Sequence, residues 1–189
     1  MNKALVLGST GGIGRAVCTV LAERGNKVVA LNRNDLQNIS EILLRENPDW
    51  IFNCIGSLGD NKSSFTEVFE PNVAINWFII KYYLEHLSAK VKVVMVGSTS
   101  YEYGRKNYIL YSASKAALHN MWQGACESFE GTNIFLGLIH PGPVETPMIE
   151  HLPRKSNILS PRDLAKSMVD LANSMENHQS LVYTEKKNE

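Results

Sequence analysis

Short apolar runs alternate with longer amphipathic stretches along most of the chain, and this pattern limits the folds that it can adopt. Six runs have the length and low charge of strands in a sheet that is covered on both faces: residues 4–8, 27–31, 50–56, 91–98, 132–140 and 181–183. The stretches between them have helix length: residues 12–24, 38–46, 64–89, 108–129 and 161–174. This alternation predicts an α/β fold, a doubly wound parallel sheet of Rossmann type with right-handed crossovers.

The chain has 189 residues, of which 44% are apolar, so residues 1–189 suit one domain with a full core and a polar tail at 184–189. Between the predicted strands at 27–31 and 50–56 there is room for one short helix only. Residues 34–40 hold either a vestigial strand or a turn. We therefore expect a sheet whose edge is shortened after its second strand.

Charge and composition exclude several classes of partner. Nineteen basic residues balance nineteen acidic ones, so nothing favours nucleic acid or an anionic membrane surface. The start of the chain lacks the apolar length of a signal peptide, and no run approaches the roughly 18 apolar residues of a membrane span, so we expect a cytoplasmic protein. The five histidines show no ligand spacing, so no metal is expected. We interpret three scattered cysteines as reduced thiols: Cys18, Cys54 and Cys126.

A glycine-rich turn, GSTGGIGRA, follows the first predicted strand and opens a helix. Gly8 suits a tight turn, while Gly12 and Gly14 let a ligand and the sheet come close to the backbone. The freed N–H groups at the start of a helix favour an anion such as a pyrophosphate. A flexible connector is the alternative, but the position between a strand and a helix favours the phosphate site.

The end of the second predicted strand bears on the choice of nucleotide. An acid at this place binds the ribose 2′-hydroxyl of NAD, whereas a basic residue accommodates the 2′-phosphate of NADP. The run Leu31-Asn32-Arg33-Asn34 has an arginine and no acid. We therefore favour NADP(H) over NAD(H), with an exposed surface arginine as the alternative interpretation.

The stretch YSASK brings a phenol and an ammonium one helical turn apart, with small residues between them. Tyr111 and Lys115 would share a helix face, and the ammonium would lower the tyrosine pKa. Such a phenol can exchange a proton with a substrate oxygen, although an ordinary helix pair has the same spacing. Ser98, thirteen residues before the tyrosine, would hold that oxygen; Thr99 and Ser100 are chemical alternatives.

These residues resemble the short-chain dehydrogenases/reductases over nearly the whole chain. Six motifs occur in the family's order and spacing: Gly8-x-x-x-Gly12-x-Gly14, Asn53-Cys54-Ile55-Gly56, Asn72, Ser98, Tyr111-x-x-x-Lys115, and HPGPVETPM at 140–148. The second motif has an isoleucine where the family has alanine. In length the chain is similar to the abbreviated branch that includes C-factor-type proteins and small carbonyl reductases.

The resemblance implies roles for four catalytic residues. Tyr111 would be the acid in reduction and the base in oxidation, Ser98 would orient the substrate oxygen, and Lys115 would bind the nicotinamide ribose. Asn72 would hold a water of a proton relay, with a residue that only bends its helix as the alternative. The resemblance also implies a cofactor-binding set: Gly8, Thr10, Gly12, Ile13, Gly14, Arg33, Asp35, Asn53, Gly56, Tyr111, Lys115, Pro141, Gly142, Val144 and Thr146.

The function that the resemblance implies is hydride transfer between NAD(P) and a small carbonyl or alcohol substrate. One alternative is a nucleotide-binding regulatory or signalling protein with little turnover. Another is a sugar-nucleotide epimerase or dehydratase, which usually needs a large C-terminal substrate domain. Residues 147–160 would form a short loop on the substrate side. The apolar helices at 64–89 and 108–129 would join subunits into a homodimer or homotetramer, or would only pack on the sheet.

Overall fold

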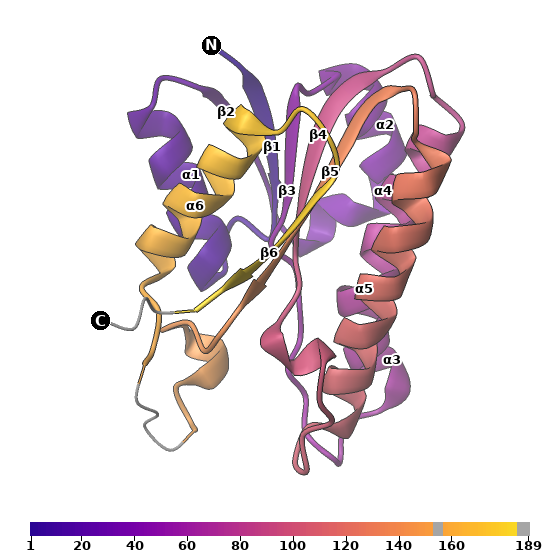
Figure 1. The fold of residues 1–189 in the computed structure, drawn as a ribbon. Helices are drawn as coiled ribbons and strands as arrows, with labels where there is room; N and C mark the ends of the chain where they lie inside the picture. The colour runs from indigo at the N-terminus through magenta and orange to yellow at the C-terminus, as the bar shows by residue number, and fades with distance from the viewer. Residues whose placement is uncertain (153–156, 185–189) are drawn as a thin grey trace.

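A computed structural model describes residues 1–152 and 157–184, except for the side chains at positions 33 and 34. Six parallel strands form one sheet in the order β2-β1-β3-β4-β5-β6, which confirms the predicted α/β fold (Figure 1). The strands are β1 (Lys3–Leu7), β2 (Lys27–Leu31), β3 (Trp50–Asn53), β4 (Lys90–Val96), β5 (Asn133–Pro141) and β6 (Gln179–Tyr183).

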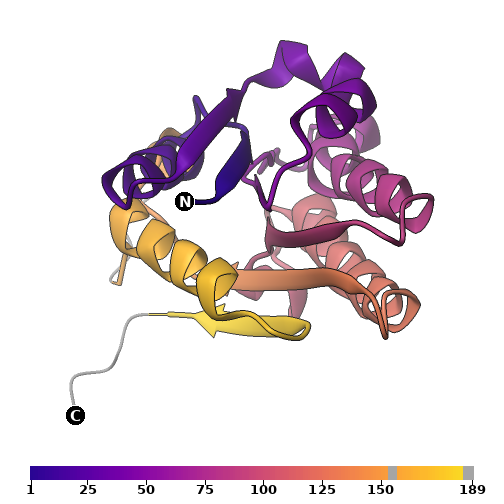
Figure 2. The ribbon, with the colours of Figure 1, turned by 90° about the horizontal axis from the view of Figure 1, so that it is seen from above.

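Helices cover both faces of the sheet. They are α1 (Gly12–Glu23), α2 (Ile39–Glu46), α3 (Phe65–Phe69), α4 (Ile75–Leu84), α5 (Ile109–Ser128) and α6 (Pro161–Ser174). Seen from above, α1 and α6 lie on one side of the sheet, and α2, α4 and α5 lie on the other (Figure 2). Within the described part of the chain, no helix combines the length and apolarity needed to cross a bilayer.

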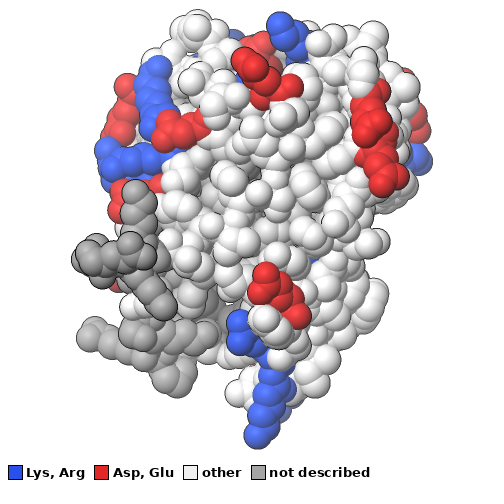
Figure 3. Space-filling view, viewed as in Figure 1, with Lys and Arg blue, Asp and Glu red and all other residues white. Residues whose placement is uncertain are grey.

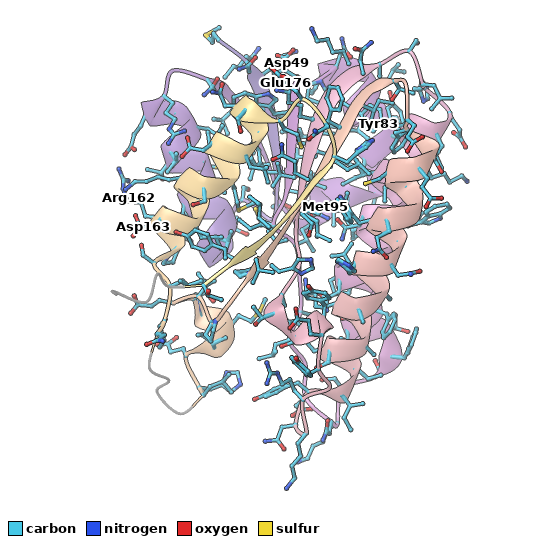
Figure 4. All side chains as sticks on the ribbon, viewed as in Figure 1. Asp49, Tyr83, Met95, Arg162, Asp163 and Glu176 are labelled. Atoms are coloured by element: carbon cyan, nitrogen blue, oxygen red, sulfur yellow. The ribbon has the colours of Figure 1, made fainter. Side chains whose placement is uncertain are left out.

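The strands divide their side chains between two cores, as the two-residue period of a strand requires. In β1, Ala4 and Val6 belong to the core under α1 and α6, whereas Leu5 and Leu7 belong to the core under α2, α4 and α5. The second core also holds Met95 of β4, one of the side chains labelled in Figure 4. Charged side chains lie mainly around the margin of the face seen in Figure 3, and both signs are mixed there.

The shortened edge of the sheet is present at β2, which has β1 as its only neighbour in the sheet. Between β2 and β3 the chain forms a 3-10 helix, η1 (Arg33–Asn38), and then α2. Residues 34–40 therefore form the helical turns of η1 and the start of α2 rather than a vestigial strand. Asp35 closes this turn, because its Oδ2 accepts a hydrogen bond of 2.8 Å from the backbone N–H of Asn32.

The predicted helix at 64–89 is wrong in detail, because the chain forms three shorter pieces there. Between α3 and α4 lies a π-helical segment, η2 (Glu70–Ala74), and α4 ends at Leu84. Pro71 lacks an N–H and cannot make the regular helical hydrogen bond, so the helix widens at this point. The widened turn carries Asn72, whose side chain is fully buried.

Candidate active site

The order of the strands reverses between β1 and β3, since β1 has β2 on one side and β3 on the other. In sheets of this kind, ligands bind outside the carboxyl ends of the strands at such a reversal. Gly8 leaves β1 with a φ of +74°, and a Cβ there would lie 3.1 Å from the backbone carbon of Cys54. A glycine is therefore required where the loops after β1 and β3 approach each other.

The glycine turn leaves room for an anion at the start of α1. A Cβ on Gly14 would lie 2.7 Å from the carbonyl carbon of Gly8 and would clash with its oxygen, so only glycine lets α1 pack on this turn. A Cβ on Gly12 would lie 2.5 Å from Cγ2 of Thr146. Among the described residues no side chain caps the first turn of α1, so its N–H groups suit the pyrophosphate of a dinucleotide.

A cavity of about 490 Å³ opens beside this turn, at the carboxyl ends of β3, β4 and β5. Many of the predicted site residues line it: Ile13, Gly56, Asn72, Ser98, Tyr111, Lys115, Pro141, Gly142, Val144 and Thr146. Other predicted residues do not line it: Gly8, Thr10, Gly12, Gly14, Asp35 and Asn53. The Arg33 side chain lies outside the described set. The fold thus gathers the predicted catalytic side chains at one cavity, while their roles stay predictions.

Tyr111 and Lys115 lie in the first turns of α5, with the Lys115 Nζ 5.6 Å from the centre of the tyrosine ring. The expected lowering of the tyrosine pKa is not met in this structure. Burial raises the pKa of Tyr111, and a hydrogen bond with Ser98 only partly opposes that rise. Since burial is the larger of these two effects, the pKa of Tyr111 lies above its usual value of 10.

Ser98 is held in place at the end of the loop after β4. Its backbone is extended, and its Oγ accepts a hydrogen bond of 3.1 Å from the N–H of Ser100. Thr99 and Ser100 also line the cavity, but the contact with the Tyr111 hydroxyl is made by Ser98. The geometry therefore favours Ser98 among the three hydroxyl residues.

Lys115 is 3% exposed, and its Nζ donates a hydrogen bond of 2.9 Å to the Val96 carbonyl. Burial lowers its pKa from the usual 10.5 to about 8. A buried ammonium without a carboxylate partner is costly for folding. We infer that this lysine is kept at the expense of stability.

Replacing Lys115 by methionine should therefore stabilise the free protein by about 1–3 kcal/mol at pH 7. Below pH 8 the folded wild type carries the full cost of the buried charge. Between about pH 8 and 10.5 the folded lysine loses its proton before the unfolded one does, so the wild type gains stability and its deficit narrows. Urea denaturation of both proteins at pH 7 and 9.5 measures this. The account would be contradicted if the two proteins had the same free energy of unfolding at pH 7, or if the difference between them increased with pH.

Asn72 joins a buried amide network that ties the helix to the sheet. Its Nδ2 donates to the Ser57 carbonyl at 2.8 Å and to the Ser114 Oγ at 3.0 Å. The backbone carbonyl of Asn72 accepts from the Asn76 Nδ2 at 3.0 Å, and the Asn76 Oδ1 accepts from the Asn53 Nδ2 at 2.8 Å. Both interpretations of Asn72 remain open, because it bends the helix and also lines the cavity.

Asn76 and His140 are two buried residues that the sequence interpretation missed. Asn76 is 3% exposed within an otherwise apolar helical stretch, which is the signal that was available. His140 is fully buried at the end of β5, where its Nδ1 lies 3.3 Å from the backbone nitrogen of Ser98. Its Nε2 lies 3.1 Å from the Nδ1 of His119. Burial lowers the pKa of His140 to about 4, so a neutral ring supports the Ser98 backbone.

The loop after β5 closes the far side of the cavity. Val144 bridges to Leu159, and the N–H of Leu159 donates to the Pro143 carbonyl at 2.8 Å. Between these points the predicted substrate-side loop contributes Met148, Ile149 and Leu152 to the cavity wall. Residues 153–156 of that loop, and 185–189 of the predicted polar tail, lie outside the described residues.

A comparison with known families identifies the family of the chain. The model of the NAD dependent epimerase/dehydratase family matches residues 4–141. The chain belongs to this family, and it is a short-chain dehydrogenase/reductase. As a short-chain dehydrogenase/reductase it is an NAD(P)-dependent oxidoreductase that acts on an alcohol or carbonyl group.

Both sequence relatives and solved structures match most of the chain. An uncharacterized oxidoreductase of Staphylococcus aureus (strain MRSA252) is 24% identical, over 88% of each chain. Among solved structures, a 3-alpha-hydroxysteroid dehydrogenase of a Pseudomonas species, complexed with NADH, has a TM-score of 0.82 at 19% identity, over 95% of this chain and 94% of that one. A short chain dehydrogenase of Burkholderia cenocepacia in complex with NADP has a TM-score of 0.79 at 18% identity, over 95% and 87%. At these identities the structures support the fold alone.

Proposed function

We propose that this short-chain dehydrogenase/reductase reduces a small carbonyl compound with NADPH, and that Tyr111 donates the proton to the carbonyl oxygen. The observation that carries the proposal is the Tyr111 hydroxyl, which faces the cavity, contacts Ser98 and belongs to the same helix as the buried Lys115. The raised tyrosine pKa supports the reductive direction at neutral pH, because a general acid must carry its proton.

Each side chain of the site has a separate part in this proposal. Ser98 donates a hydrogen bond to the carbonyl oxygen of the substrate and so orients it toward Tyr111. Lys115 binds the ribose hydroxyls next to the nicotinamide, and its charge stabilises the tyrosinate that remains after proton transfer. Asn72 lies beside Lys115 at the back of the cavity, where it supports a proton path to solvent.

The residues around the cavity fit a bound NADP(H), which supplies the hydride when it is present. The glycine turn and the uncapped start of α1 suit the pyrophosphate. Gly142 and Val144 line the place proposed for the nicotinamide, and Thr146 lies against the glycine turn, within reach of the carboxamide or a phosphate. Asn53 ends β3, and Gly56 lines the cavity from the loop that follows this strand.

We expect Arg33→Ala to weaken NADPH binding by roughly tenfold or more and NADH binding by less than twofold, because a charged contact to the 2′-phosphate is removed. Fluorescence titration of the purified protein with each cofactor measures both affinities. Arg45→Ala is a matched control, since it removes an exposed arginine of α2 whose only ion pair among the described residues is with Glu46. An equal loss for NADPH and NADH would remove the preference for NADP.

Turnover of a carbonyl panel tests the proposed function as a whole. NADPH absorbance should fall with at least one aldehyde or ketone, and NADPH should bind at micromolar concentration. Binding without any turnover would favour the alternative of a nucleotide-binding regulatory protein, which the shortened sheet edge at β2 supports. Failure to bind either cofactor below the millimolar range would contradict both interpretations.

We propose further that the protein is a cytoplasmic homodimer or homotetramer. Trp77 and Phe78 of α4 are 44% and 52% exposed, and large apolar side chains on a helix favour a subunit interface. Light scattering at micromolar concentration should give twice or four times the mass of one chain. A monomer would contradict the proposal.

A further inference from the structure

The cavity wall has an unequal charge distribution, although the whole chain is neutral. Besides the buried Lys115, its charged lining residues are Arg105 and Lys106, and no described aspartate or glutamate lines it. Apolar groups also line the cavity, from Leu58, the Tyr108 ring and the side chains of the loop after β5, and Asn107 adds a polar amide next to Lys106 in the chain. A ligand of this region therefore meets an apolar surface with a positive end.

The two cations have no ion pair among the described residues. Other arginines and lysines of the structure do pair, as Arg162 does with Glu23 at 2.8 Å. The acids in the neighbouring loops are engaged elsewhere: Glu102 accepts a hydrogen bond from the Tyr101 hydroxyl, and Asp60 accepts from the N–H groups of its own turn. Arg105 and Lys106 are thus available to an anion from outside the chain.

The backbone under these cations is fixed relative to Tyr111. The N–H of Arg105 donates to the Ser112 Oγ at 3.0 Å, and Ser112 is the next residue after the proposed acid. The carbonyl of Lys106 accepts from the Asn61 Nδ2 at 2.9 Å. Figure 1 shows this region at the lower tip of the molecule, where loops following β3 and β4 meet, and Figure 3 shows both basic and acidic side chains at this end. A charged group on a pinned backbone can set the position of a substrate.

We infer that the substrate carries an anionic group, a carboxylate or a phosphate, separated by an apolar segment from the carbonyl that is reduced. This inference rests on the proposed function, because it assigns the substrate of the same cavity. Arg105 and Lys106 bind the anionic group at the mouth, and the apolar wall holds the segment that leads to Ser98 and Tyr111. A guanidinium is well suited to either anion, since it can donate two parallel hydrogen bonds.

The first test compares turnover of matched substrates with NADPH. A length series of linear keto acids is measured against the methyl ester of each. The phosphate monoesters of linear keto alcohols are measured against the free keto alcohols, so that the two anion types are distinguished. We expect at least one anionic member to have a kcat/KM roughly tenfold above its neutral partner, as a charged hydrogen bond provides. The preference should shrink at high salt, because both cations are exposed.

Variants assign the preference to the two cations. Arg105→Gln and Lys106→Gln should each lower kcat/KM for the anionic substrate by roughly fivefold to tenfold and change the neutral substrate by less than twofold. Lys62→Gln is the matched control, since Lys62 is an exposed lysine of the neighbouring loop after β3 and does not itself line the cavity. If Lys62→Gln lowered kcat/KM for the anionic substrate as much as the other two variants, the preference would come from general electrostatic attraction and not from a binding site. That result would overturn the inference.

A binding measurement makes the inference independent of turnover. Calorimetry of octanoate against octanamide, each added to the NADPH complex, should show tighter binding of octanoate that Arg105→Gln abolishes. Equal affinity of the two ligands, or equal turnover of acids and esters, would overturn the inference and leave the proposed reductase function intact. Octanoate binding that depends on Arg105, without reduction of any carbonyl, would support the inference and contradict the proposed function.

Discussion

Tyr111→Phe should lower kcat for carbonyl reduction by roughly a thousandfold or more and leave the NADPH affinity almost unchanged. General acid catalysis contributes about a hundred- to ten-thousandfold to such rates, and phenylalanine has no proton to give. The cavity keeps its shape, because the substitution removes one oxygen atom only. Steady-state kinetics and a fluorescence titration of the same preparation separate the two effects.

Two further tyrosines make this result specific. Tyr103 is 66% exposed and does not line the cavity, so Tyr103→Phe should keep the wild-type rate. Tyr108 does line the cavity, three residues before Tyr111. A large loss in Tyr108→Phe together with a preserved rate in Tyr111→Phe would show that the acid is assigned to the wrong phenol.

Gly14→Val should destabilise the protein by about 3 kcal/mol or more and abolish cofactor binding. The new Cβ would meet the Gly8 carbonyl group, and a backbone atom cannot move aside as the end of a side chain can. Either α1 leaves the sheet or the glycine turn opens, and both changes disrupt the proposed pyrophosphate site. Urea denaturation and cofactor titration measure the two effects.

Gly124→Ala is the control for a glycine within a helix. Gly124 lies inside α5, and a Cβ there would meet nothing within 4 Å. This substitution should therefore be neutral or stabilise the protein by about 0.5–1 kcal/mol, because alanine is the better helix former. A comparable loss of stability in both variants would show that crowding at the glycine turn is not the cause.

The strands were predictable from the sequence because each is a short apolar run, and the two-residue period within β1 divides it between both cores. The helix at 64–89 was predicted as continuous, because the pattern of apolar residues gives no information about the backbone hydrogen bond that is lost at Pro71. The shortened edge after β2 followed from chain length alone, because a segment of that size has no room for another strand and helix.

At the site, motif spacing was enough to predict that Ser98 and Tyr111 would meet, because a strand end and the following helix have nearly fixed positions in this fold. The direction of the Tyr111 pKa was wrong, because the extent of burial depends on the whole fold. His140 and Asn76 were missed for the same reason, since a polar residue in an apolar run gives no indication of its hydrogen-bond partner.

A crystal structure of the complex with NADP⁺ tests the central claim most directly, because it locates the Tyr111 hydroxyl relative to the nicotinamide carbon that carries the hydride in NADPH. We expect the Lys115 Nζ within about 2.6–3.2 Å of the ribose hydroxyls next to the nicotinamide, with the Tyr111 hydroxyl facing the reactive edge of the ring. The account would be contradicted if the nicotinamide bound away from the cavity next to Ser98 and Tyr111. In that arrangement the phenol could not reach the oxygen of a carbonyl group whose carbon receives the hydride.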